Sequence, residues 1–186
     1  MKKIICFALV AAMLLLVSCK NQNTNKGSVI SPSTKENIAE VEPTDNTQKT
    51  ESLEEIVLYY PDAEGQKLKK DIRFVSDVQA NDAEFILKTL IEGTQTQDCI
   101  NVIPFSTTIN SCEVDSGICT VDLSGDFLTI QGTLTKELAV YSIVNTLCSI
   151  NGVDKVVFFI DGEKLSLFGN MYLEEPIEAN MTIAEQ

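Results

Sequence analysis

The chain has 186 residues, a length typical of one domain, with 14 basic residues against 27 acidic ones and a formal net charge of −13. This charge argues against nucleic acid as a partner and against a polybasic grip on anionic lipid; charged partners should offer basic patches. The absence of histidine excludes His-based catalytic triads, His general bases and His metal ligands.

Residues 1–18 are predicted to be a lipoprotein signal peptide. Lys2 and Lys3 precede an apolar run at 4–17, which suits a signal peptide and is short for a bilayer span. Ser18 and Cys19 end a lipobox-like stretch, so we expect cleavage before Cys19 and lipidation of its thiol, with acyl chains such as palmitate. Two or more acyl chains give stable anchoring, which predicts a location on the outer face of the cell membrane. An uncleaved anchor and a plain secretory signal are the alternatives.

Residues 19–52 are predicted to be the lipidated cysteine and a disordered tether. The stretch after Cys19 is rich in Asn, Thr, Ser, Gln, Lys and Glu, with two prolines and no aromatic residue. Such a composition buries too little apolar surface to offset the entropy of ordering. As a flexible coil the tether would span about 30 Å root-mean-square, so the folded part could stand off the membrane.

Residues 53–178 are predicted to fold, with a tail at 179–186. β-prone stretches at 54–60 and 67–75 predict two strands. A helix is then expected from Asn81, as its cap, to Gly93, because apolar residues recur there with helical spacing and glycine favours a helix stop.

The next part of the chain predicts an irregular connection at 94–107 and then a hairpin. A two-residue turn at Ser116-Gly117 would pair Val114 with Cys119 and Cys112 with Val121. All four side chains would then share one face of the hairpin.

The second half predicts a long helix at 135–151, capped by Thr135, and a buried strand at 155–160. A short strand at 165–168 is expected to pair back, and residues from 170 onward form an acidic stretch of uncertain order. Strands and two amphipathic helices in this order predict an α+β fold, a two-layer mixed β-sheet with two helices packed on one face.

Four cysteines would remain in the mature domain, namely Cys99, Cys112, Cys119 and Cys148. An even number in an exported chain makes disulfides possible, but the spacing selects none of the three connectivities, and buried free thiols are the alternative. On the expected hairpin register Cys112 and Cys119 are diagonal, which is poor but not impossible for a bridge. The chain contains no CxxC motif, so the sequence indicates neither a thioredoxin-type redox site nor a zinc site.

One acidic pattern resembles part of a calcium-binding loop. Asp122, Ser124 and Asp126 form D-x-S-x-D, which could offer oxygen ligands to Ca²⁺, but Phe127 and Thr133 stand where a calcium loop needs Gly and Glu. We therefore expect these residues to make local backbone hydrogen bonds and predict no metal site.

Asp154 and Asp161 flank the strand at 155–160. The strand would hold them roughly 20 Å apart, too far for paired acid/base chemistry, so they are expected in turns. No activated nucleophile or phosphate-binding loop occurs, so we predict no catalytic residue, no cofactor and no enzyme activity.

Aromatic residues gather in two of the predicted strands. Tyr59 and Tyr60 lie in the first strand, and Phe158 and Phe159 lie in the buried one. Side chains of this kind in strands pack in a core more often than they form a ligand platform, so we expect core packing.

Several segments resemble the GerMN domain of the GerM sporulation and germination family. They are residues 58–62, 91–93 and 121–124, and the long helix followed by residues 156–162. The resemblance covers about 54–178 and implies an extracytoplasmic, often lipid-anchored domain, similar to ring-building motifs of secretion machines, that scaffolds protein complexes without known catalysis. This chain has one such domain where GerM has two, and the four cysteines are not expected of the family.

The predicted function is that of a membrane-anchored, non-enzymatic interaction domain that supports assembly of an envelope or sporulation complex. The membrane, through Cys19, and an envelope protein are the expected partners, with a homo-oligomer as a further possibility. The alternative is a solute-binding lipoprotein for a small ligand such as a peptide or glycan.

Overall fold

The computed structural model describes residues 52–185, which belong to one compact unit. The predicted signal peptide, Cys19 and nearly all of the tether lie outside the described residues and remain predictions. No helix within 52–185 is both long and apolar enough to cross a membrane.

The first two strands form an antiparallel hairpin, with β1 at Leu53–Pro61 and β2 at Leu68–Ser76. Asp62 closes the turn, since its Oδ1 accepts a hydrogen bond from the Gln66 N–H at 2.7 Å. Both strands were predicted. They form a two-stranded sheet of their own, apart from the main sheet.

Two helices follow the hairpin, α1 at Asp77–Ala80 and α2 at Ala83–Glu92. The cap of α2 is Asp82, whose Oδ1 accepts from the Phe85 N–H at 3.0 Å. The prediction of Asn81 as this cap was wrong, because Asn81 ends α1 and its side chain donates to the Asp77 carbonyl. Gly93 ends α2 with a φ of +105°, as glycine allows.

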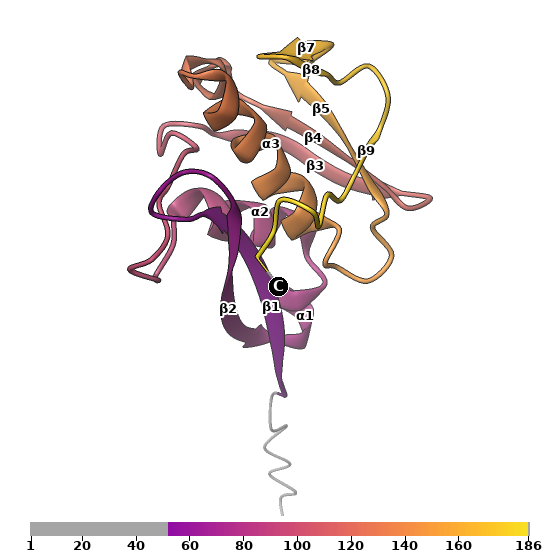
Figure 1. The fold of residues 1–186 in the computed structure, drawn as a ribbon. Helices are drawn as coiled ribbons and strands as arrows, with labels where there is room; N and C mark the ends of the chain where they lie inside the picture. Colours follow the sequence, from indigo (N-terminus) through magenta and orange to yellow (C-terminus); the bar gives the residue numbers. More distant parts are fainter. Residues whose placement is uncertain (1–51, 186) are drawn as a thin grey trace, which may run out of the picture. The chain divides into compact units, whose positions relative to one another are not determined.

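The main sheet is mixed (Figure 1). The predicted hairpin register is confirmed, with Val114 opposite Cys119 and Cys112 opposite Val121. The second strand of this hairpin, at 118–123, runs parallel to the predicted buried strand at 155–160. The buried strand also pairs with two short antiparallel strands. The members are β3 (Ile109–Asp115), β4 (Ile118–Leu123), β5 (Lys155–Ile160), β6 (Glu163–Lys164) and β9 (Ile177–Glu178).

A 3₁₀ helix, η1 (Gly125–Thr129), leads to the long helix α3 (Thr133–Leu147). The helix begins two residues before the predicted Thr135 cap, because Gly132 accepts the first helical hydrogen bond, from the Lys136 N–H. It ends at Leu147 rather than 151. α3 packs against β1, where Thr146 Oγ1 accepts from the Tyr59 N–H at 2.9 Å.

The last part of the chain is more ordered than the sequence predicted. The stretch at 165–168 was predicted to pair with β5, but β6 makes this pairing instead. Leu167–Phe168 (β7) pairs with Met171–Tyr172 (β8). Beyond β9, the chain reaches the first hairpin: Leu68 donates to the Ile183 carbonyl and accepts from the Glu185 N–H, both at 2.8 Å. Residues 177–185 therefore form a strap between the main sheet and β2.

Buried side chains of β1, α2, α3, β4 and β5 meet in one core. Tyr59, Tyr60 and Phe158 are buried in the interior, whereas Phe159 is partly exposed on the other face of β5. The α+β class is confirmed by this arrangement of mixed sheet and helices.

Candidate functional site

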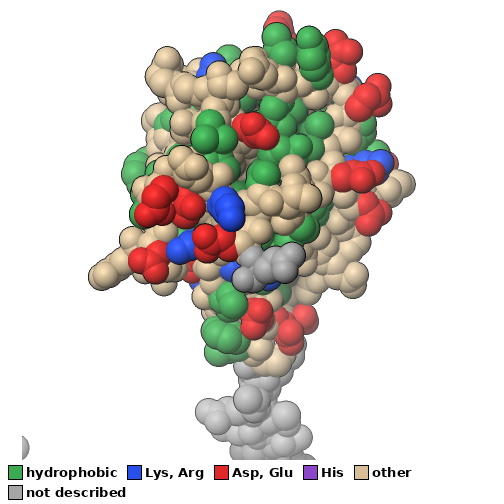
Figure 2. Space-filling model, viewed as in Figure 1, with side chains coloured by type: hydrophobic (Ala, Val, Ile, Leu, Met, Phe, Trp, Pro, Cys, Tyr) green, Lys and Arg blue, Asp and Glu red, His purple; other side chains and the backbone are tan. Residues whose placement is uncertain are grey.

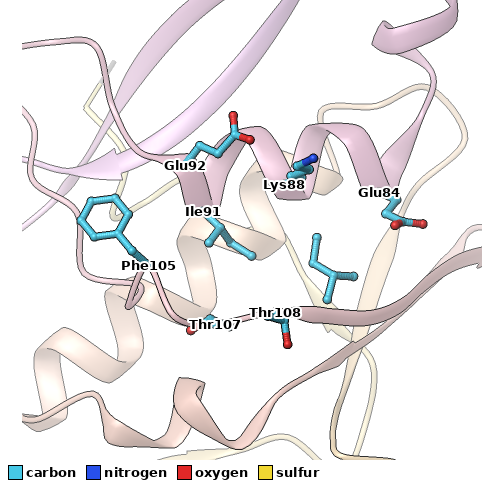
Figure 3. Close-up of a pocket in the computed structure, with 8 residues that line it drawn as sticks. Glu84, Lys88, Ile91, Glu92, Phe105, Thr107 and Thr108 are labelled. Atoms are coloured by element: carbon cyan, nitrogen blue, oxygen red, sulfur yellow. The ribbon is translucent and has the colours of Figure 1, made fainter.

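A groove of about 460 Å³ lies between α2 and the segment 105–109 that leads into β3 (Figure 3). Its lining from α2 consists of Glu84, Lys88, Ile91 and Glu92, and its lining from the segment consists of Phe105, Thr107, Thr108 and Ile109. We call this feature the α2 groove. Figure 3 shows Ile91 pointing from the helix into it, with Glu84 at one end and Phe105 at the other.

The segment 105–109 is fixed by hydrogen bonds to the sheet and within itself. Thr108 donates its N–H to Ser124 Oγ at 3.0 Å and accepts from the Ser124 N–H at 2.9 Å. Thr107 donates its N–H to the Pro104 carbonyl at 2.9 Å. This bracing holds Phe105 outward, with 71% of its surface exposed.

The other end of the connection is fixed by a buried ion pair on β2. Asp71 is 5% exposed and accepts hydrogen bonds from Arg73 at 3.0 Å, from the Gln95 N–H at 2.9 Å and from Thr94 Oγ1 at 3.0 Å. Arg73 also donates to the Gly93 carbonyl at 2.6 Å. The pair therefore sets the direction in which the chain leaves α2.

The α2 groove is apolar inside and acidic at its rim. Ile91, Phe105 and Ile109 supply apolar surface, and Glu84 and Glu92 place two carboxylates against the single ammonium of Lys88. Thr107 Oγ1 is buried and has no hydrogen-bond partner within residues 52–185. An unsatisfied buried hydroxyl costs folding free energy.

A second hollow, of about 640 Å³, lies on the other side of α2. Lys88 and Glu92 line both hollows, and the second also includes Ile72 and Phe74, which are 50% and 64% exposed. The exposed side of α2 thus stands between the α2 groove and a second hollow of mixed polar and apolar lining. Figure 2 shows exposed hydrophobic side chains interspersed with charged ones on one face of the molecule.

The residues of the D-x-S-x-D pattern do not make the local backbone hydrogen bonds predicted for them, because Asp122 and Ser124 bond to backbone groups far away in the sequence. Asp122 Oδ1 accepts from the Gly162 N–H at 3.2 Å, Ser124 Oγ accepts from the Thr108 N–H, and Asp126 lies in η1. Among the described residues, no group of three or more Asp, Glu or Cys side chains is placed to hold a metal ion.

Asp154 and Asp161 lie at opposite ends of β5, as predicted. Asp161 is in a turn with a φ of +49°, and its Oδ2 accepts from the Gly125 N–H at 3.0 Å. The sequence did not predict that Asn110 lies within 3.4 Å of both Asp122 and Asp161. This contact follows from the parallel pairing of β4 with β5, which brings the ends of both strands together.

All four domain cysteines carry free thiols in the structure. Cys112 Sγ lies 3.6 Å from Cys119 Sγ, whereas Cys148 Sγ donates to the Asp154 carbonyl at 3.3 Å. Burial raises the pKa of Cys148 to about 11 and also raises the pKa of Cys99.

The lining residues Phe105, Thr107 and Ile109 were not predicted as a site. One signal was available: Phe105 is a large aromatic residue in a stretch of Pro, Ser and Thr, outside any periodic pattern. Such a residue in a connecting segment is more often exposed for binding than one in a strand.

A family model described as "Germane: Sporulation and spore germination" matches residues 57–166, more than half of the chain. The chain belongs to this Germane family. The match spans β1 to the residues just before β7, and so includes the groove and the main sheet except for β9. The family resemblance noted in the sequence is thereby confirmed.

Solved structures support the same fold. The first GerMN domain of the sporulation protein GerM from Bacillus subtilis is 21% identical with a TM-score of 0.56, covering 67% of this chain and 96% of that one. The tandem GerMN domains of the same protein are 20% identical with a TM-score of 0.54, covering 68% of this chain and 46% of that one. This Germane-family chain thus spans about half the length of the tandem structure.

A candidate lipoprotein from Clostridium perfringens is 18% identical with a TM-score of 0.50, covering 68% of this chain and 87% of that one. A comparison with curated proteins finds no match. At these identities the structural likeness establishes the fold of the Germane-family domain.

Proposed function

We propose that this protein is a lipid-anchored extracytoplasmic lipoprotein whose domain docks a partner protein in the α2 groove, in support of an envelope or sporulation complex. The observation that carries the proposal is an apolar groove with an acidic rim beside the unpaired edge of β3. The family description and the GerM structures concern sporulation, and one similar structure is a candidate lipoprotein, which supports this setting.

The occupant we propose is an extended segment of a partner that presents an apolar side chain next to Lys or Arg. Glu84 and Glu92 would attract the basic residues, and the net charge of −13 would steer them over a longer range. Ile91, Phe105 and Ile109 would contact the apolar side chain.

The edge of β3 offers a second attachment for such a segment. β3 is the terminal strand of its sheet, so its backbone groups on the side away from β4 have no strand partner among the described residues. An unpaired edge is a template for strand addition, in which backbone hydrogen bonds give affinity and side-chain pockets give specificity. The groove and this edge therefore favour a peptide segment over a compact solute.

Photo-cross-linking in intact cells tests the docking site. A photoreactive residue at Phe105 is expected to cross-link to a partner, whereas the same residue at Tyr172, which is also an exposed aromatic, is not. A synthetic peptide with the cross-linked sequence should then bind the full chain, and Phe105→Ala should weaken it about 30-fold, or about 2 kcal/mol, as for an aromatic hot spot.

Tyr172→Ala is the matched control and should leave peptide affinity unchanged. Cross-links only at Tyr172, or equal affinity of the Phe105→Ala chain and the parent, would contradict the docking site. Cross-links from Phe105 to a second copy of the chain would identify an oligomer interface instead. A thermal shift with small molecules, without peptide binding, would support the solute-binding alternative.

The anchor has its own test in a Cys19→Ser chain. This chain is expected to lose its lipid and its membrane association, because the thiol is the acceptor of the diacylglyceryl group and no acyl chain would then hold the domain. Membrane fractionation with metabolic lipid labelling measures both. Cys6→Ser, a change within the signal region, should still be lipidated; a Cys19→Ser chain that fractionates like the parent would rule out the anchor.

A further inference from the structure

The closest pair of thiols in the described part of the chain lies in the β3–β4 hairpin. Cys112 Sγ and Cys119 Sγ are 3.6 Å apart, in van der Waals contact and short of a bond. Cys119 is fully buried, and Cys112 is partly exposed beside α2.

The register of the hairpin explains the contact. Cys112 pairs with Val121 and Cys119 pairs with Val114, so the two cysteines occupy diagonal positions on one face. Diagonal neighbours on adjacent strands remain within side-chain reach. Cys148 lies at the end of α3 and Cys99 lies beside Asp62, so neither shares the hairpin.

We propose that Cys112 and Cys119 form a reversible disulfide by exchange with an external disulfide, whether of an oxidoreductase or of a small molecule. The step would occur outside the cytoplasm, where disulfides persist, and so depends in cells on the proposed export. The purified chain can form the bridge whether or not it is exported or binds a partner.

The chemistry balances in two exchanges. The Cys112 thiolate attacks one sulfur of the external disulfide, forms a mixed disulfide and releases one thiolate. The Cys119 thiolate then attacks Cys112 Sγ, closes the bridge and releases the second thiolate. Two protein thiols are oxidised, the external disulfide is reduced by two electrons, and the thiol protons pass to the leaving thiolates through water.

Accessibility sets the order of the two steps. An external disulfide reaches Cys112, because Cys119 is fully buried. The hydrogen bond between the sulfurs raises the pKa of Cys112, which burial raises further, and lowers the pKa of Cys119. The raised pKa of Cys112 makes the first exchange slow. In the mixed disulfide Cys112 has no S–H left to donate, and the second exchange is fast because Cys119 Sγ already lies 3.6 Å from Cys112 Sγ. The mixed disulfide therefore does not accumulate.

Peptide mapping of the full chain, treated with oxidised glutathione and then digested after glutamate, tests the bridge. Cleavage after Glu113 puts Cys112 in peptide 93–113 and Cys119 in peptide 114–137. A Cys99→Ser chain makes Cys112 the sole cysteine of the first peptide. The linked peptide should be the predominant cross-linked peptide, because no other pair of thiols among the described residues is in contact, and it should disappear with dithiothreitol.

A Cys119→Ser chain should instead trap glutathione on Cys112, because the second exchange has no attacking thiol. The bridged parent should also unfold several degrees higher than its reduced form, and a Cys148→Ser chain should keep this difference. The proposal is overturned if both cysteines stay open to alkylation after oxidation, or if either bridges to Cys99 or Cys148. Peptide binding at Phe105 is measured separately, so failure of one proposal leaves the other standing.

Discussion

A Phe158→Ala chain is expected to lose about 3–5 kcal/mol of its free energy of unfolding. Phe158 lies in the central strand of the main sheet, and its side chain is fully buried in the core shared with α2 and α3. Truncation removes the buried ring and leaves a cavity that close-packed neighbours fill only in part. Denaturant unfolding followed by circular dichroism should show a lower midpoint with an unchanged slope.

Phe159→Ala is the matched control in the same strand. Its side chain points to the opposite face of β5, where it is partly exposed. The loss should therefore be clearly smaller than for Phe158. Equal losses for the two variants would show that the core does not lie on the face assigned to it.

An Asp71→Ala chain is expected to lose about 3 kcal/mol, because it leaves the largely buried Arg73 guanidinium without its counter-ion. The Gln95 N–H and Thr94 hydroxyl lose their acceptor as well. Denaturant unfolding measures the loss. An exposed acid on the same connection, Asp98, serves as the control, and its alanine variant should stay within about 0.5 kcal/mol of the parent.

The role of Asp71 also predicts how the free energy of unfolding changes with pH. Burial alone would raise the pKa of Asp71, but hydrogen bonds from Arg73, the Gln95 N–H and Thr94 together hold it below its usual value. The folded state thus favours the carboxylate, and this stabilisation is complete above the unfolded pKa of about 4 and is lost as pH falls through the lower, folded pKa. The Asp71→Ala chain should lack this acid-side loss; an unchanged acid limb would contradict the assignment.

Local signals predicted the elements that depend on local chemistry. Ser116-Gly117 fixed the hairpin register because a two-residue turn allows few alternatives, and Gly93 marked the end of α2. The strand at 155–160 was predicted to be central because residues 156–160 are continuously apolar. The cap of α2 was misplaced by one residue, since Asn81 and Asp82 are both favourable caps and only tertiary packing decides between them.

The α2 groove depends on contacts that no local pattern encodes. The segment 105–109 has no helical or strand period, and its path is set by Ser124 and by the ion pair on β2. The separation of β1 and β2 from the main sheet, and the parallel pairing of β4 with β5, are likewise properties of the assembled fold.

The strap at 177–185 has a consequence for the timing of folding. On the outer edge of β2, the backbone of Leu68 bonds to Ile183 and Glu185. The side chain of Asn145 on α3 forms hydrogen bonds of 2.8 and 3.0 Å with the backbone of Asn180. These partners are synthesised after every other element of the domain, so the outer edge of β2 at Leu68 cannot be closed until the strap has appeared. Because a domain generally folds as a unit, the outer edge of β2 stays open to solvent and to other chains until residues 183–185 have been made.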